Sequence, residues 1–261
     1  MREYFSRVYD ARYFWLHLAR IELMNRFRRS KLGILWVCIN PLCLTAIMSV
    51  VFGVAFKQDI ASYAPYILSG LIFWDLFSGA FVTGNMAIIA NEPYIRQFNH
   101  PLTIYTLKSG LVLVANFLIE LVALMIWVLF IHPTNILVGL FTLPATILIY
   151  FPLAWGGVTI AAFVCTKYRD YPQVAALVMQ AFWYISPVFM QESLFQSNPI
   201  LLTWFNTNPI THLLYLVRMP FLKGQLPSPA NYLISILFVV FIDFLAIRIN
   251  KSWGKDLIFY I

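Results

Sequence analysis

Long apolar runs separated by short polar segments dominate the chain. Residues 32–56 contain no charged side chain over 25 positions. At 1.5 Å per helical residue, such a run exceeds the ~30 Å hydrocarbon core of a bilayer. The predicted spans are residues 32–56, 63–90, 109–131, 136–165, 173–190 and 230–249. The pattern therefore predicts an all-α polytopic membrane protein with six transmembrane helices in a single domain, residues 1–261.

Three other segments fit neither a span nor a plain loop. Residues 7–29 carry two apolar stripes with charges between them, which predicts a helix lying in the membrane interface, with a simple peripheral anchor as the alternative. Residues 91–105 alternate apolar and polar side chains, which predicts a short helix projecting from the membrane. Residues 191–225 hold two apolar runs broken by Asn and Pro. Each run is too short to span, which predicts re-entrant helices at the outer face.

Positive charge orients this arrangement. Of the 18 Lys and Arg residues, all except Lys57, Arg218 and Lys223 fall in segments on one side of the six predicted spans. Because Lys and Arg are enriched on the cytoplasmic side, both termini and residues 91–105 are predicted to be cytoplasmic.

Composition excludes several classes of protein. With 61% apolar, 17% aromatic and only 11% charged residues, the chain has too little polar surface to cover a soluble globule. The net charge of +7 does not indicate nucleic acid, because the basic residues border apolar spans; membrane lipid is the expected counterpart. The cysteines, Cys38, Cys43 and Cys165, have no paired or metal-binding spacing, so no redox or metal function is predicted.

The densest basic cluster directly precedes the first span and comprises Arg26, Arg28, Arg29 and Lys31. Guanidinium groups grip phosphate through two parallel hydrogen bonds, so the cluster is a candidate gate for an anionic lipid-linked substrate. The alternative is that it only sets the topology.

Catalytic motifs are missing. The sequence has no phosphate-binding G-x-x-x-x-G-K-[ST] loop, no H-E-x-x-H and no G-x-S-x-G. We therefore expect no enzymatic activity, cofactor or metal in this chain.

Four motifs in order resemble the membrane subunits of ABC-2 type polysaccharide exporters, which move O-antigen, capsule or teichoic-acid chains. The first is R-F-R-R-S-K-L-G-x-L-W at residues 26–36, followed by Pro41. The second is the segment 85–108. The third is R-D-Y-P-Q-V at 169–174 with Ser186-Pro187-Val188, and the fourth is N-P-I-T-H-L-L-Y-L-V-R at 208–218. Together they extend the resemblance over nearly the whole chain.

The resemblance implies partners and a location. Two copies of the chain would pair with two ATPase subunits, which bind the ATP and Mg²⁺, in a bacterial inner membrane. The substrate would be an undecaprenyl-pyrophosphate-linked polysaccharide, most like O-antigen. The helix after the second span would dock into the ATPase through Glu92, Tyr94, Ile95, Arg96, Phe98 and His100.

Charged and aromatic side chains within the spans are candidates for the channel lining. Buried carboxylates in a membrane usually face protein or a water-filled path, so Asp75, Glu120 and Asp243 are either structural or channel-facing. Aromatic rings are either core and lipid contacts or a track on which sugar rings slide. The candidates for the channel lining are Trp74, Phe77, Phe81, Glu120, Phe182 and Tyr184.

Two other functions stay open on the sequence alone. A small-molecule or drug exporter of the same superfamily would share the fold. An integral-membrane acyl or glycosyl transferase would need acid, base or metal-binding residues clustered at one membrane face, and the sequence offers no convincing cluster.

Overall fold

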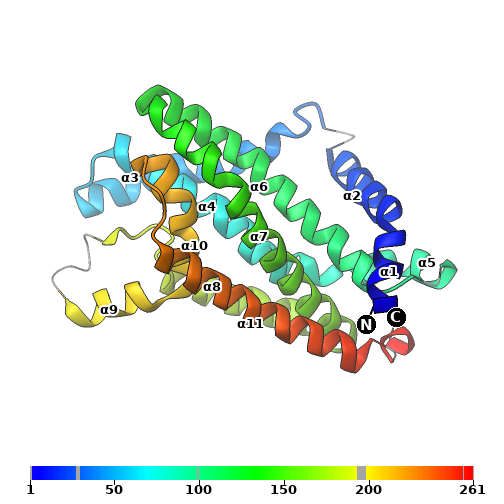
Figure 1. Cartoon of the computed structure of the whole chain (residues 1–261). Coiled ribbons are helices and arrows are strands. Elements are labelled where there is room, and N and C mark those ends of the chain that lie inside the picture. Colours follow the sequence, from blue (N-terminus) through cyan, green and yellow to red (C-terminus); the bar gives the residue numbers. More distant parts are fainter. Residues whose placement is uncertain (1, 28–29, 99, 193–197, 255, 261) are drawn as a thin grey trace.

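The computed structural model describes residues 2–27, 30–98, 100–192, 198–254 and 256–260, and these are mostly helical with no strand among them. Within these described ranges, five helices are long and apolar enough to cross a membrane. They are α3 (Leu35–Phe56), α4 (Ile60–Val82), α6 (Thr103–Ile131), α7 (Pro133–Lys167) and α11 (Pro229–Trp253). Figure 1 shows the axes of the long helices α6, α7 and α11 lying roughly along one another. The predicted all-α membrane fold is confirmed.

The fifth predicted span, residues 173–190, has no counterpart of spanning length among the described residues. The helix found there, α8 (Tyr171–Ile185), has 15 residues, or about 22 Å of helix. It ends at Ser186, whose backbone is extended (φ −89°, ψ 148°). The physical reason is Pro187, which disfavours the helical conformation in the residue before it.

Beyond α8 the chain continues along α4 without helix. At one end the Tyr171 hydroxyl donates a hydrogen bond to the Phe81 carbonyl (3.1 Å). At the other, the Tyr66 hydroxyl donates to the Met190 carbonyl (2.8 Å). Residues 171–190 therefore run antiparallel to α4, partly as helix and partly as extended chain.

Two predicted helices have different bounds from those expected. The described part of the predicted helix 7–29, residues 7–27, is divided between two helices, α1 (Arg2–Asp10) and α2 (Arg12–Phe27). The segment 91–105 forms only a short helix, α5 (Glu92–Gln97), because Phe98 is extended (φ −124°, ψ 130°). Two 3₁₀ turns, η1 (Gly84–Met86) and η2 (Ile89–Asn91), join α4 to α5.

The helix α7 is central, with its most extensive contacts to α6 and α11. Small residues let it approach α4 closely: a Cβ on Gly157 would lie 2.8 Å from the Cβ of Ala80, and one on Gly84 would lie 2.6 Å from Val158 Cγ2. These distances are too short for any side chain larger than hydrogen. Ala80 and Gly84 thus form the small-xxx-small contact that their spacing predicts, and α7 is its partner.

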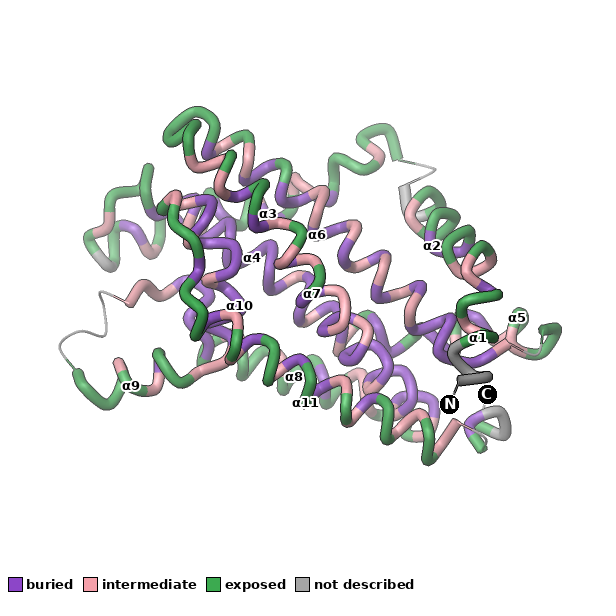
Figure 2. Tube along the Cα trace, viewed as in Figure 1, coloured by how far each residue is buried: buried purple, intermediate pink, exposed green. Residues whose placement is uncertain are grey.

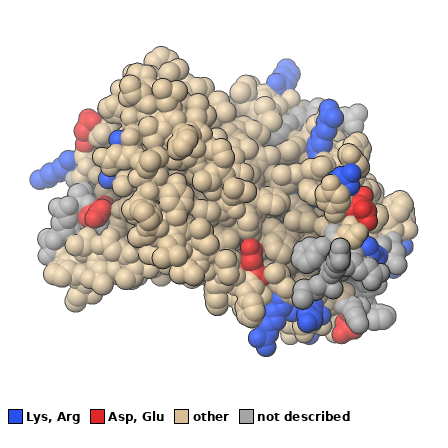
Figure 3. Space-filling model, in the orientation of Figure 1, with Lys and Arg blue, Asp and Glu red and all other residues tan. Residues whose placement is uncertain are grey.

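Two hydrophobic clusters lie at different levels of the molecule, and buried positions concentrate along its middle (Figure 2). The smaller cluster joins Leu18 of α2, Tyr105 of α6 and Leu257 near the C-terminus. Both chain ends therefore lie at the same end of the molecule (Figure 1). On the face in Figure 3, Lys and Arg gather mainly near that end, and most of the remaining surface is uncharged.

At the opposite end, the chain between α8 and α11 forms α9 (Pro199–Thr207), α10 (Pro209–Arg218) and the wider π-helical turn η4 (Met219–Lys223). Asn208 caps α10 by accepting a hydrogen bond from the Ile210 N–H. The helix α10 packs along α7, where the Tyr150 hydroxyl donates to the Leu213 carbonyl (2.8 Å). Both short apolar runs thus form helices, as predicted. The helix α10 packs against the long helices, whereas α9 is mostly exposed and contacts mainly α10. Their re-entrant position in a membrane stays a prediction.

Candidate functional site

The short helix α5 projects at the end that holds both termini (Figure 1). Its aromatic side chains Tyr94 and Phe98 are 40% and 47% exposed. The ring of Phe14 on α2 lies beside them, with centroids 6.1 Å from Tyr94 and 5.9 Å from Phe98. The same ring lies 5.0 Å from His100. The projection therefore presents aromatic surface to solvent while α2 supports it from one side.

The remaining residues predicted for the ATPase contact divide between solvent and interior. Arg96 Nε and Glu92 Oε1 form an ion pair one turn apart at 2.8 Å, and their side chains are 63% and 39% exposed. Ile95 packs against the smaller hydrophobic cluster. The six predicted residues are thus brought together on one projection; their contact with a partner stays a prediction.

Lys108 of α6 is a buried lysine that joins three segments. Its Nζ lies 2.6 Å from Glu22 Oε2 on α2 and 3.1 Å from Asn91 Oδ1 in η2. The lysine side chain is 6% exposed and that of Glu22 is 44% exposed. Asn91 immediately precedes α5 and donates its amide to the Ala87 carbonyl (2.8 Å). One ammonium group therefore fastens α2, the approach to α5 and the start of α6.

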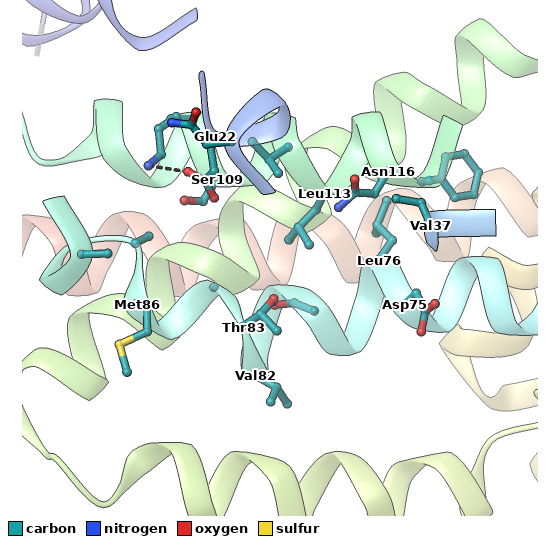
Figure 4. A pocket seen from close by; sticks show the side chains of 18 of the residues that line it. Glu22, Val37, Asp75, Leu76, Val82, Thr83, Met86, Ser109, Leu113 and Asn116 are labelled. Carbon is teal, nitrogen blue, oxygen red and sulfur yellow. Dashed lines mark hydrogen bonds and ion pairs between the residues drawn. The ribbon is translucent and has the colours of Figure 1, made fainter. Parts of the chain in front are cut away.

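A cleft of about 910 Å³ opens beside this lysine, between α2, α3, α4 and α6. Figure 4 shows two walls, one from α2 and α6 and the other from α4 and η1. The polar residues that line the cleft are Glu22, Asn25, Asn40, Asp75, Ser78, Thr83, Asn91, Lys108, Ser109, Asn116 and Glu120. The other lining residues are mostly apolar, and three of the four helices are of spanning length. The cleft therefore offers a hydrophilic ligand several hydrogen-bonding groups within a largely apolar wall.

The structure describes the predicted phosphate gate only in part. Arg28 and Arg29 lie outside the described residues. Arg26 belongs to the last turn of α2, and Lys31 is exposed. Asn25, just before the basic segment, and Trp36, five residues after Lys31, line the cleft. The role of the segment as a gate stays a prediction.

The three intramembrane carboxylates have different surroundings. Glu120 is 5% exposed and, with Asp75, lines the cleft. Asp243 on α11 instead lies against Gly156 of α7. Two of the three therefore face a polar cavity, as carboxylates in membranes usually do. Whether the cavity belongs to a transport path stays a prediction.

The predicted aromatic lining splits into buried and exposed rings. Trp74 and Phe77 are 8% and 4% exposed within the main core, where the Trp74 ring lies 5.2 Å from that of Trp183. Phe81 is half-buried, while Phe182 and Tyr184 on α8 are exposed. Within one chain, the first two rings therefore serve as core contacts, and the α8 rings remain available to a partner or ligand.

Arg218, at the end of α10, is buried to 2% exposure. Its guanidinium donates to the carbonyls of Pro187 (2.9 Å) and Val188, and to the hydroxyls of Tyr66 (2.9 Å) and Ser69 (3.3 Å). The guanidinium carbon also lies 3.7 Å from the centroid of the Tyr66 ring, which is a cation–π contact. Burial lowers the pKa of the guanidinium, but arginine starts so high that the charge remains at neutral pH. The side chain thus joins α4, α10 and the short segment that follows α8.

Sequence reasoning missed the Lys108 and Arg218 contacts. Glu22 is predicted to pair with Arg26 one turn away, whereas the structure pairs it with Lys108. The partners of Arg218 on α4 lie 149 and 152 positions away in the chain. The sequence did offer one signal, because Lys108 and Arg218 both stand beside long apolar runs. A charged side chain at such a position either reaches water or is buried with a partner, and the sequence alone does not decide between the two.

Comparison with known proteins defines the class. A family model described as ABC-2 type transporter matches residues 13–222, so this chain is a multi-pass membrane protein that belongs to the ABC-2 type transporter family. It is similar to proteins named O-antigen export system permease protein RfbA. One from Klebsiella pneumoniae is 23% identical over 83% of this chain and 82% of the relative. Another from Myxococcus xanthus is 22% identical over 85% of each chain.

Proposed function

We propose that this chain is the permease subunit of an ATP-driven exporter of lipid-linked polysaccharide, with O-antigen as the substrate. Membership of the ABC-2 family and the names of its relatives support this assignment. The polar cleft at membrane depth suits a hydrophilic substrate. The chain supplies the route, and a separate ATPase supplies ATP hydrolysis.

The proposed assembly contains two copies of the chain and two ATPase subunits in the bacterial inner membrane. Exposed apolar side chains on α3 and α8, such as Val54 and Leu177, are available for contact with lipid or a second copy. Each chain crosses six times with both termini in the cytoplasm. Two ends on one side require an even number of crossings, and residues 171–190 supply the sixth beside the five long helices.

The basic segment receives the substrate on the cytoplasmic side. Arg26, Arg28, Arg29 and Lys31 bind the pyrophosphate that links undecaprenol to the glycan, because guanidinium groups match phosphate oxygens. The glycan then passes outward between the two copies, with Phe182 and Tyr184 of each α8 along the path. Residues 191–225 shape the outer exit.

The observation that carries the proposal is the projection of α5 at the end of the molecule with both termini. An exposed aromatic helix at that end is suited to docking in a cleft of a motor subunit. Because η2 and Lys108 tie α5 to α2 and α6, a displacement of α5 by the ATPase would reach the cleft and the basic segment.

Replacing Tyr94 and Phe98 together with alanine is expected to lower co-purification of the ATPase at least tenfold. Aromatic side chains dominate the binding energy of many interfaces, and each can contribute about 2 kcal/mol or more. Tagged permease is purified from native membranes, and the recovered ATPase is quantified by immunoblot. Phe130→Ala is the matched control, since Phe130 is 84% exposed at the opposite end of α6. Normal recovery from the double variant would reject the docking role.

Capsular polysaccharide, teichoic acid and small molecules are the other possible cargoes. Deleting the chain separates them: loss of O-antigen from the cell surface supports the proposal. Loss of capsule or teichoic acid identifies another glycan. Increased drug sensitivity with unchanged surface glycans identifies a small-molecule exporter.

A further inference from the structure

The cleft carries amide and carboxylate side chains on every helix that lines it. Glu22 and Asn25 come from α2, and Asn25 directly precedes the segment 26–31. The long helices contribute Asn40 from α3, Asp75 from α4, and Asn116 and Glu120 from α6, and we refer to these four as the interior residues. Carboxylates repel phosphate, so a ligand whose phosphate binds the segment 26–31 must present a different group to the interior.

Asn116 carries a buried side-chain oxygen without a partner. The residue is 9% exposed, and its Oδ1 accepts no hydrogen bond from any described residue. Figure 4 shows its side chain extending from α6 toward the cavity. A buried amide oxygen without a partner destabilises the protein, and a bound ligand that donates a hydrogen bond to it removes this cost.

We propose that this interior is a binding subsite for the sugar next to the pyrophosphate of a lipid-linked glycan. Sugar hydroxyl groups both donate and accept hydrogen bonds, which suits a mixture of amide and carboxylate groups. Trp36 lines the cleft beside Asn40 and is 49% exposed, so it offers an apolar face to the C–H groups of a sugar ring. The cleft volume of about 910 Å³ falls in the range of small-ligand sites, roughly 300–1,000 Å³.

The neighbouring apolar groove does not provide these contacts. It lies on another face of α3, lined by Leu35, Ile39 and Leu42 with residues 122–131 of α6, and measures about 590 Å³. Cys38 also lines this groove, and its thiol already donates to the Ile119 carbonyl (3.3 Å). Sugar hydroxyls would find almost no hydrogen-bond partner there. The polar cleft is therefore the place for the carbohydrate.

The test measures binding of defined lipids to the chain in nanodiscs, together with its ATPase. The probes are polyprenyl pyrophosphate alone and polyprenyl pyrophosphate carrying one hexose or one N-acetylhexosamine. We expect one of the glycosylated lipids to bind at least tenfold more tightly than the sugar-free lipid, as measured by thermophoresis. Asn116→Leu and, separately, Glu120→Gln should reduce this preference to less than threefold and leave the affinity for the sugar-free lipid within twofold.

Asp243→Asn is the matched control, because Asp243 is an intramembrane carboxylate outside the cleft; it should keep the full preference. Equal affinity of the wild-type protein for all three lipids would overturn the subsite, as would a preference that survives both cleft variants. Tight binding of tetraphenylphosphonium that Glu120→Gln abolishes, without any sugar preference, would identify a cation site instead.

The inference rests on the proposed export function, and the two can fail separately. If the wild-type chain supports surface O-antigen but shows no preference for glycosylated lipid, the subsite alone is wrong. If it supports no glycan export and binds none of the three lipids, the export function itself is wrong.

Discussion

Replacing Arg218 with methionine should destabilise the protein by about 2–6 kcal/mol. Two buried carbonyls, those of Pro187 and Val188, lose their charged donor, and each unsatisfied group costs roughly 1–3 kcal/mol. The cation–π contact with Tyr66 is lost as well. The midpoint of thermal unfolding in mild detergent should fall by at least about 5 °C.

Arg218→Lys and Arg248→Met make this prediction specific. Lysine keeps the charge but lacks the planar fork that reaches several acceptors at once, so its midpoint should lie between those of wild type and Arg218→Met. Arg248 is exposed on α11, and its replacement should change the midpoint by less than 1 °C. A wild-type midpoint for Arg218→Met would show that the buried contacts do not hold α10 to α4.

Reversing the charge of Lys108 should have an effect of similar size. In Lys108→Glu, a carboxylate at a position that is 6% exposed would face both Glu22 and the Asn91 oxygen. Breaking a buried ion pair in this way costs about 3–5 kcal/mol, and the partial exposure of Glu22 places the effect toward the lower end. The unfolding midpoint and the amount of surface glycan should both fall.

The swapped double variant, Glu22→Lys with Lys108→Glu, isolates the pair. It restores opposite charges, so we expect it to recover at least half of the lost stability, which a double-mutant cycle measures directly. Lys251→Glu, at an exposed position of α11, is the control for a change of net charge. If the swap recovers nothing, the pair does not join α2 to α6.

The ion pair between Lys108 and Glu22 also affects how a movement of the ATPase would reach the rest of the chain. In the variant Lys108→Glu, the ATPase should still co-purify, since Tyr94 and Phe98 are intact. Export should fall because α5 is no longer fastened to α2. Loss of both properties together would instead indicate that the whole end of the molecule that holds the termini has unfolded.

The sequence predicted the elements whose cause is local. A long uncharged run such as residues 32–56 is stable in a membrane whatever its tertiary neighbours are. For the same reason, four other long spans could be predicted from their apolar composition alone. Proline and asparagine marked the start of α10 in the same way, because their effects on the backbone extend over only a few residues. The length of α8 was missed, since the effect of Pro187 on Ser186 was not weighed against the apolar pattern.

The candidate site was only partly predictable. The sequence pointed to the exposed projection around Tyr94 and to Glu120 as a carboxylate in a membrane. It could not show that Glu120, Asp75 and Asn116 line one cleft, because they come from different helices whose rotation about their axes depends on packing. The spacing of Ala80 and Gly84 predicted a close approach by another helix, but it could not identify Gly157 and Val158 of α7 as the partners.

By itself, the sequence determined that this chain is a membrane protein, which stretches form its five long helices and which end is basic. Those properties follow from hydropathy, charge and the conformational limits of proline, all of which act between neighbouring residues. Only the tertiary structure decided that Lys108 meets Glu22 and that Arg218 meets Tyr66. A buried charge must find its partners in space, and the packing of whole helices determines which ones it can reach.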